Sequence, residues 1–272
     1  MIPDKTSFKN VPYTCSGGSV KPLFGCKTSH YRFRYIKSRC NITVVNNTMH
    51  GKSISAQLNE QGDSVFLPWQ ENHITSLRLE APLQANIGVK FFYTANMHGC
   101  KFYVDTIKRS NDVVVYHANA KEEDPGGDNR APNSQLPACV QKLDELHGMA
   151  QREYGNIIQK NIISFGKTNY FKDANPLVAL KKVRVLPVGI RKRKAEWGGK
   201  CFVYAYPAGG KWKFYYQTFG QVSYDRPSGA GNVILGAITG HWKYLHKLRT
   251  EGKTGIVRPF SVISSGEIPI LG

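Results

Sequence analysis

Two strand-like runs separated by a short polar segment constrain the fold of this chain most, and they lie within residues 91–120, FFYTANMHGCKFYVDTIKRSNDVVVYHANA. Residues 101–105 and 113–118 are rich in aromatic and β-branched side chains, which favour β-strands. The segment between them, TIKRSN, is polar and turn-forming. The sequence therefore predicts an antiparallel β-hairpin.

The register of this hairpin decides which side chains lie together. If the loop is symmetric about Lys108 and Arg109, Cys100 lies directly opposite His117, and the Cβ atoms of such a pair are about 4.5 to 5.5 Å apart. Side-chain alternation supports this register, because it separates a mostly apolar face from a more polar one. The apolar face carries Cys100, Phe102, Val104, Val113, Val115 and His117, and the polar face carries Lys101, Tyr103, Asp105, Val114 and Tyr116.

A thiol beside an imidazole is a recurring catalytic pair. The imidazole accepts the thiol proton, and the resulting imidazolium lowers the pKa of the thiol below its free value of about 8.5. A purely structural role also fits Cys100 and His117, since free cysteine is among the most buried residue types and an inward-facing histidine can be a core residue. Spacing alone therefore leaves both roles open.

Residues near the pair favour the catalytic interpretation. The loop before the cysteine could present the backbone N–H of Cys100 to a developing oxyanion, and Gly99 would permit close approach of the backbone. Thr94 could orient the His117 ring, and Asn119 could do so instead or simply cap the strand. The site loop consists of Met97, His98 and Gly99.

Four motifs occur in a fixed order around these residues. VFLPWQ spans 65–70, a threonine stands six positions before the cysteine, Gly-Cys-Lys occupies 99–101, and VVVYHANA is a hydrophobic strand ending in histidine. Weaker echoes lie at 233–240 and around 203–210. In this order the motifs resemble the Burkholderia lethal factor family of glutamine deamidase toxins, which is related in fold to the catalytic domain of the cytotoxic necrotizing factors and to the chemotaxis-receptor deamidases.

The resemblance implies roles for individual residues. It makes Cys100 the nucleophile, His117 the general base and acid, and Thr94 the third member of the site. The family pattern before the cysteine is Leu-Ser-Gly, whereas this chain has Met-His-Gly. The oxyanion loop therefore differs from the family pattern, and His98 becomes an alternative base.

The resemblance also implies a substrate and a place of action. It implies a bacterial toxin that converts a glutamine of a host protein to glutamate, with the eukaryotic translation-initiation DEAD-box helicase as target and a block of translation as the result. The first ten residues lack an apolar stretch of the signal-peptide kind, and no run of about 18 apolar residues occurs. We therefore expect no membrane span, and secretion without a classical signal peptide followed by action in the host cytoplasm.

The remaining segments predict an α+β fold, with a β-sandwich core of mixed sheets flanked by helices, in a single catalytic domain spanning residues 1–272. Strand-like segments between 41 and 67, NITVV, SISAQL and SVFLPW, predict a meander leading into the hairpin. Residues 186–219 predict a second hairpin system, with WGGK and PAGGK as turns, and PFSVIS predicts a strand near the C-terminus.

Two helices and one long loop are also expected. Apolar residues recur at close to helical spacing in 138–160 and in 232–248. The Pro/Gly-rich segment 121–137 predicts a mobile loop at the rim of the site. The first of these helices is expected to pack on the sheet.

The charge balance indicates which partners the chain attracts. It carries 37 Lys and Arg against 19 Asp and Glu, a formal net charge of +18, which favours acidic partners. Residues 1–40 are interpreted as a basic N-terminal extension and residues 185–200 as a basic elongation of a hairpin. YRFRYIK at 31–37 alternates aromatic and basic residues, as do single-strand nucleic-acid surfaces and edge strands with one wet face. A non-enzymatic nucleic-acid-binding module is therefore an alternative function.

The cysteines do not predict a metal site or a cofactor. All six are widely scattered, which argues against a disulfide framework in a chain of this length. Cys15, Cys26, His30 and Cys40 lack the close CxxC pairs of zinc sites. A related transglutaminase or protease would use the same thiol–imidazole pair, so these activities stay open beside deamidation.

Overall fold

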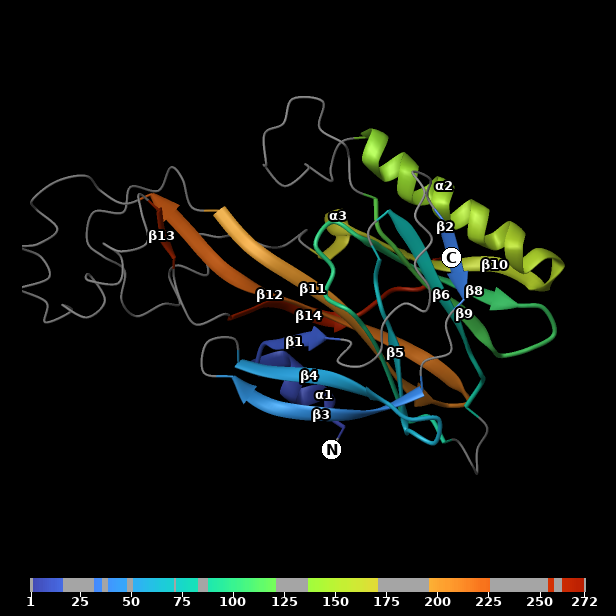
Figure 1. The fold of residues 1–272 in the computed structure, drawn as a ribbon, viewed down its shortest axis with the longest axis horizontal. Coiled ribbons are helices and arrows are strands. Elements are labelled where there is room, and N and C mark those ends of the chain that lie inside the picture. Colours follow the sequence, from blue (N-terminus) through green and yellow to red (C-terminus); the bar gives the residue numbers. More distant parts are fainter. Residues whose placement is uncertain are drawn as a thin grey trace, which may run out of the picture.

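The computed structural model shows a β-sandwich with helices on its outer faces (Figure 1). It describes residues 2–16, 32–35, 39–47, 51–70, 72–82, 88–120, 137–170, 196–225, 254–256 and 261–271. The helices in this part of the chain are α1 (Lys5–Asn10), α2 (Pro137–Tyr154) and α3 (Lys167–Tyr170), with a short 3-10 helix at Gly155–Ile157. The predicted α+β fold class, with a β-sandwich core of mixed sheets, is confirmed.

The larger sheet joins nine of the described strands in the order β1-β4-β3-β5-β7-β11-β12-β13, with β14 also paired to β12. It is mixed, because β1 runs parallel to β4 and β5 parallel to β7, whereas β11 and β12 form a long antiparallel hairpin. Its strands are β1 (Tyr13–Ser16), β3 (Arg39–Asn47), β4 (Gly51–Leu58), β5 (Ser64–Leu67), β7 (Phe91–Thr94), β11 (Glu196–Ala208), β12 (Lys211–Asp225), β13 (Thr254–Ile256) and β14 (Ser261–Glu267).

The smaller sheet joins five described strands in the order β10-β8-β9-β6-β2. Its centre is the predicted hairpin of β8 and β9, and β2, from the YRFRYIK segment, lies at one edge and runs parallel to β6. Its strands are β2 (Arg32–Tyr35), β6 (His73–Leu79), β8 (Lys101–Ile107), β9 (Val113–Ala118) and β10 (Ile158–Phe165).

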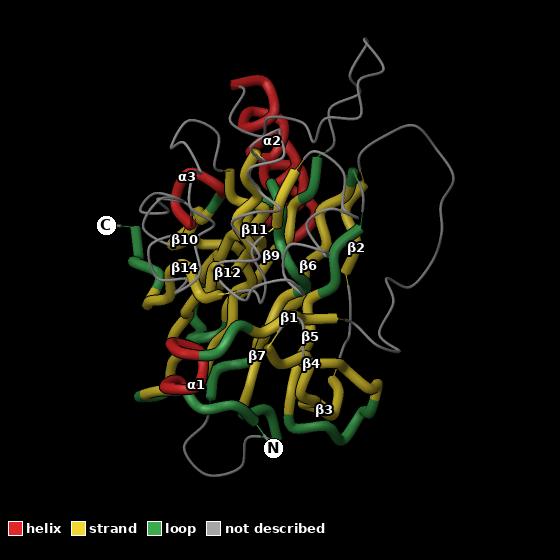
Figure 2. The backbone as a smooth tube through the Cα atoms, turned by 90° about the vertical axis from the view of Figure 1, so that its left-hand side faces the viewer, coloured by secondary structure: helices red, strands yellow, loops and turns green. Residues whose placement is uncertain are grey.

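The two sheets pack face to face around one apolar core. Phe92 and Val203 from the larger sheet and Phe102, Val115 and Leu77 from the smaller one belong to the same buried cluster. A second cluster lies between the smaller sheet and α2, and a third covers the outer face of the larger sheet with α1. Figure 2 shows this order, with α2 at the top, α1 at the bottom and the strands between them.

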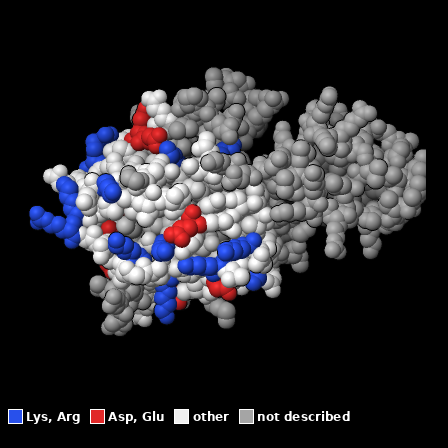
Figure 3. All heavy atoms as spheres, turned by 180° about the vertical axis from the view of Figure 1, so that it is seen from behind, with Lys and Arg blue, Asp and Glu red and all other residues white. Residues whose placement is uncertain are grey.

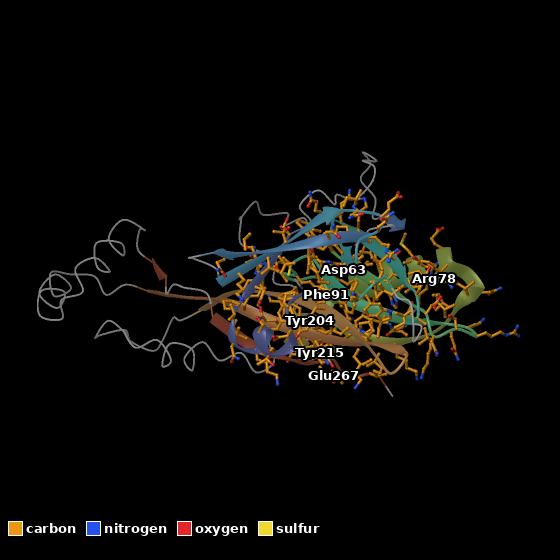
Figure 4. All side chains as sticks on the ribbon, turned by 90° about the horizontal axis from the view of Figure 1, so that it is seen from below. Asp63, Arg78, Phe91, Tyr204, Tyr215 and Glu267 are labelled. Atoms are coloured by element: carbon orange, nitrogen blue, oxygen red, sulfur yellow. The ribbon has the colours of Figure 1, made fainter. Side chains whose placement is uncertain are left out.

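The first residues of the chain are part of this packing. Asp4 caps α1 by accepting a hydrogen bond from the backbone N–H of Ser7 at 2.6 Å. Phe8 is fully buried, with its ring centroid 4.2 Å from that of Tyr204 on β11. Phe91, Tyr204 and Tyr215 follow one another across this outer face (Figure 4), which gives the larger sheet an aromatic second core.

Several predicted elements are confirmed. The three strand-like segments between 41 and 67 form β3, β4 and β5, and PFSVIS overlaps β14. The predicted meander was wrong, because β5 pairs with β3 and not with β4. PAGGK forms the turn between β11 and β12, where Gly209 and Gly210 both take the positive φ that glycine adopts without strain. Runs of β-branched and aromatic residues between turn-forming segments thus identified these strands.

The register of the predicted hairpin was wrong. Phe102, rather than Cys100, lies opposite His117. The reason is the turn, because β8 continues to Ile107 and Arg109 adopts a φ of 58°, which shortens the loop and moves its centre. The shift amounts to two residues, so side-chain alternation still keeps Cys100 and His117 on one face.

The face expected to be more polar is buried instead. Apolar residues of α2 pack against it, including Leu143, Leu146 and Ala150. This face of the hairpin therefore belongs to the apolar cluster between the smaller sheet and α2, which includes Tyr103, Val114 and Tyr116. Asp105 is fully buried on the same face.

Two element boundaries also differ from the sequence-based prediction. The helix expected over 138–160 ends at Tyr154, because Gly155 takes a φ of 60°, and the chain continues as β10. WGGK is not a turn but part of β11, where Gly199 lies opposite Gly220. Three other expected segments lie wholly or partly outside the described residues. They are the helix at 232–248, the loop at 121–137 except for its last residue, and residues 185–195 of the basic segment 185–200.

The helices in the described part of the chain do not have the length and apolar character needed to cross a membrane.

Candidate active site

Cys100 lies directly before β8, where the loop from β7 reaches the core between the sheets, and 3% of its surface is exposed. Its sulfur accepts a hydrogen bond from Nδ2 of Asn119 at 3.1 Å. Extending the hairpin register by one pair places Asn119 opposite Cys100. Oδ1 of Asn119 accepts the backbone N–H of Asn72 at 3.2 Å, and its own N–H donates to the carbonyl of His73 at 2.9 Å. The side-chain nitrogen of Asn119 is thereby held toward the sulfur.

The environment of the Cys100 sulfur combines burial with hydrogen-bond donors. Burial raises the pKa of the thiol above its ordinary value, while Asn119 and the backbone N–H groups of His98 and Cys100 act in the opposite direction without cancelling the effect. The thiol is therefore uncharged at neutral pH. Donors nevertheless already surround the position where negative charge would develop.

His117 is fully buried on β9, between Phe102 of β8 and Thr75 of β6. It stands two positions after Val115, so both side chains lie on the same face of β9, and Val115 belongs to the core between the sheets. Its ring therefore lies in the layer that also contains Cys100, as the sequence predicted. The two residues are diagonal neighbours across the hairpin, a placement that separates Cα atoms by about 7 to 8 Å.

The His117 imidazole lacks hydrogen-bonding partners. Among the described residues, none is bonded to either ring nitrogen. Burial lowers the pKa of the ring to about 3, so at pH 7 the ring is neutral, with one donor and one acceptor unused. Buried polar groups are nearly always paired in folded proteins, and a catalytic role is one of the explanations for an exception.

The loop before Cys100 is fixed from two sides. Gly99 takes a φ of 94°, and its N–H donates to the hydroxyl of Tyr170 on α3 at 2.9 Å. Met97 exchanges two backbone hydrogen bonds with Cys201 of β11, at 2.5 and 2.9 Å. The predicted site loop is therefore a rigid segment held by both α3 and the larger sheet.

Thr94 also faces the core between the sheets, but its hydroxyl is engaged elsewhere. It donates to the carbonyl of Ala95 at 2.9 Å and accepts the N–H of Val203 at 3.1 Å. The expected hydrogen bond to His117 is not formed. Thr94 thus ties β7 to β11, and Asn119, the other residue expected to orient the ring, bonds to the Cys100 sulfur instead.

His98 is exposed, unlike the other imidazole near the thiol. Its pKa is lowered, first by partial loss of solvent around the ring and then by the charges of Lys167 and Lys200. Its backbone N–H lies close enough to the Cys100 sulfur to lower the pKa of the thiol. His98 therefore lies between the buried thiol and the surface.

The sequence analysis missed a second polar cluster, on the opposite face of the hairpin. Both carboxylate oxygens of the fully buried Asp105 lie against Nε2 of His147, at 3.2 and 3.0 Å. Gln151 and Asn161 donate to the same carboxylate at 3.0 and 2.9 Å. Burial alone would raise the pKa of Asp105, but these partners, His147 foremost, hold it below its ordinary value.

Two supporting residues of the thiol site were also missed. Asn72 has a φ of 57°, and an asparagine in the loop after LPWQ is a signal for such a left-handed residue. Tyr170 carries no comparable signal, because its contact with Gly99 depends on how α3 packs. In the part of the chain that the structure describes, no group of three His, Cys, Asp or Glu side chains is placed to hold a metal ion.

Comparison of the chain with protein families and with curated proteins identifies no relative. No protein-family model matches the chain, and no curated protein matches it at a significant level.

Proposed function

We propose that the chain is a cysteine-dependent protein glutamine deamidase. The observation that carries this proposal is a buried thiol, contacted by an oriented amide donor, on the same inner face as an imidazole to which no described residue is bonded. The ordered motifs around Cys100 and His117 support the same chemistry, since they resemble a family of glutamine deamidase toxins.

The first step is attack by the sulfur on the side-chain amide of a protein glutamine. The thiol proton passes to the neutral His117 ring as the bond between sulfur and the amide carbon forms. The oxygen of the amide takes up negative charge, which backbone N–H groups near Cys100 stabilise. The imidazolium then protonates the departing nitrogen, the carbon–nitrogen bond breaks, and ammonia leaves a thioester on Cys100.

The second step hydrolyses this thioester. The neutral His117 ring takes a proton from a water molecule, whose oxygen attacks the thioester carbon. The carbon–sulfur bond breaks, and the proton returns from the imidazolium to the sulfur. The net reaction consumes one water, releases one ammonia and leaves glutamate in place of glutamine.

Asn119 has a defined part in this scheme. Its Nδ2 donates to the sulfur, so it stabilises the thiolate against the burial that raises the pKa of the thiol. Its opposite end is fixed by Asn72, so the donor needs no rearrangement when charge develops. In this proposal Asn119 takes the third place, which the resemblance implies for Thr94.

The substrate proposal rests on the resemblance alone. It points to the translation-initiation DEAD-box helicase of a eukaryotic host, and to a secreted effector that acts in the host cytoplasm. Conversion of a glutamine to a carboxylate would add a negative charge to the target and so disrupt a surface built around a neutral amide.

Proteomics of a eukaryotic lysate tests the proposal. Treatment with the native protein should produce a glutamine that gains about one dalton and releases ammonia, and the Cys100→Ser variant should not. Cross-linked proteins would instead indicate a transglutaminase, and backbone fragments a protease. A lysate unchanged by the native protein, together with salt-dependent binding of nucleic acid that survives Cys100→Ser, would favour the non-enzymatic alternative.

A further inference from the structure

Three basic side chains surround the loop that carries Cys100. The first is Lys200, which is exposed on β11 and directly precedes Cys201. Cys201 exchanges two backbone hydrogen bonds with Met97, so Lys200 is fixed beside the start of the site loop. The larger sheet therefore supplies one cation to the edge of the thiol site.

The second is Lys167, the first residue of α3. The last residue of this one-turn helix is Tyr170, whose hydroxyl accepts the N–H of Gly99 at 2.9 Å. Residues three apart lie on the same side of a helix, so Lys167 is carried toward the same loop. His98, the third basic group, stands in the loop between these two attachment points.

The two lysines of this group lack carboxylate partners in the described part of the chain. Within the described residues, neither Lys167 nor Lys200 forms an ion pair, whereas the neighbouring Lys101 is bonded to Asp144 at 2.7 Å. Both lysines lie close enough to His98 for their charges to lower the pKa of its ring, after the larger effect of its partial burial. The two lysine charges are thus kept near each other beside the loop that carries Cys100, and the described residues supply no carboxylate that pairs with either of them.

We propose that His98, Lys167 and Lys200 form a basic rim that binds an acidic segment of the protein substrate next to the target glutamine. This inference rests on the proposed deamidase function and adds the class of sequence that the site would select. Carboxylate side chains flanking the glutamine would take the places of the missing ion-pair partners while the glutamine amide reaches the sulfur.

A protein segment fits the rim better than a nucleic acid does. The thiol beneath the rim attacks the carbon of an amide, the group that a glutamine side chain carries. The rim is a compact group of three, not a long stripe that could follow a phosphate backbone. On the face shown in Figure 3, Lys and Arg side chains are spread over the described surface with acidic residues among them, so that face offers no such stripe either.

Two glutamine peptides test the inference, one with aspartates on both sides of the glutamine and one with serines in their place. Ammonia release by the native protein should show kcat/KM about 5- to 10-fold higher for the acidic peptide, mostly through KM. The Lys167→Gln/Lys200→Gln variant should lose this preference and process the serine peptide as before. Added salt should reduce the preference of the native protein.

A matched control removes two exposed lysines elsewhere on the smaller sheet. Lys108 is at the far end of the hairpin and Lys160 on β10, so Lys108→Gln/Lys160→Gln should retain the preference. The single variant Lys200→Gln, at an exposed position, gives a second reading if the partly buried Lys167 affects folding. Thermal melting of each variant separates loss of binding from loss of structure.

Direct binding keeps this test separate from that of the deamidase function. Fluorescence anisotropy of both peptides with the Cys100→Ser protein should show tighter binding of the acidic peptide, and that difference should vanish when both lysines are replaced. Equal binding of the two peptides, or a preference unchanged in the double variant, would overturn the rim even if deamidation of glutamine is observed. Displacement of the acidic peptide by a single-stranded oligonucleotide that binds more tightly would overturn it in favour of a nucleic-acid surface.

Discussion

Two buried histidines lie on opposite faces of the smaller sheet and differ in almost every contact. His147 of α2 is bonded to the carboxylate of Asp105 and stacks on Tyr103, with ring centroids 4.1 Å apart. His117 of β9 is fully buried and has no bonded partner at either nitrogen in the described structure. The first imidazole completes a polar network that joins a helix to a sheet. The second imidazole has one donor and one acceptor to which no described residue is bonded.

This contrast separates structural from chemical use of the same side chain. The His147 imidazole is bonded to a buried carboxylate and helps to hold a helix on the sheet, whereas the unbonded His117 imidazole lowers stability and keeps its acceptor free on the face that carries Cys100. We therefore expect substitutions at the two positions to affect different properties, the activity at His117 and the stability at His147.

The largest effect is expected on activity. His117→Leu removes the proposed base and acid and should lower kcat/KM for deamidation by about 1,000-fold or more, as loss of a central catalytic group does. The free energy of unfolding should stay the same or rise by about 1 kcal/mol, because two unpaired polar atoms are removed from the core. His98→Gln, which tests the alternative base, should lower the rate by less than about 10-fold. A larger loss at His98 than at His117 would reverse the assignment.

The next effect is on stability. His147→Leu leaves the buried Asp105 carboxylate without its main partner and should lower the free energy of unfolding by about 2 to 4 kcal/mol, measured by urea denaturation. Replacing Asp105 by asparagine in the same chain should recover part of the loss, because the buried charge is removed. A melting curve unchanged in His147→Leu would show that the Asp105 cluster is not a structural element.

The pH dependence of stability should separate the two sites. The pKa of His117 is about 3 in the folded chain, below the unfolded value of about 6.5, so the unfolded state binds more protons between these values. Stability should therefore fall by up to about 1.4 kcal/mol per pH unit as the pH drops from about 6 to 4. His117→Leu should flatten this part of the curve.

Asp105 contributes in a different pH range. Its pKa is lowered in the folded chain, so its contribution is present above the unfolded value of about 3.9 and is lost as the pH falls through the folded value. Replacement of Asp105 should change the curve only below about pH 4. A slope between pH 6 and 4 that is the same in the native protein and in His117→Leu would contradict the assignment of a buried, unprotonated His117.

The smallest effect is expected at Asn119. Asn119→Ala removes one donor to the Cys100 sulfur and should lower kcat about 10-fold, while KM changes little. It should also raise the pKa of the thiol further, so alkylation of Cys100 by iodoacetamide should slow at a given pH. Asn72→Gly preserves the backbone N–H and tolerates the positive φ at this position, so it serves as the control for Asn119. Faster alkylation in Asn119→Ala would show that this hydrogen bond does not stabilise the thiolate.

Local sequence patterns were sufficient to predict one part of the site. The alternation of side-chain direction along β8 and β9 placed Cys100 and His117 on one face, and this holds because a face survives any shift by an even number of residues. The register was not predictable in the same way. It depends on the positive φ of Arg109, a conformation that the TIKRSN segment does not announce.

The parts that could not be predicted depend on tertiary packing. The pairing of Asp105 with His147 requires α2 to lie across the hairpin, and neither residue marks this in its own segment. The same holds for the contact between Tyr170 and Gly99, which joins residues from α3 and the site loop. Thr94 was predicted to orient the ring of His117, but its hydroxyl bonds to the backbone of β11 and of its own loop.

The most direct test is to capture the covalent intermediate. Native protein mixed with a glutamine peptide and quenched in acid should carry a thioester on Cys100, seen by intact mass as the peptide mass less about 17 daltons for the lost ammonia. The adduct should be absent from Cys100→Ser and much slower to form in His117→Leu. Deamidation that continues in Cys100→Ser, or an adduct that forms equally fast without His117, would contradict a thiol–imidazole mechanism.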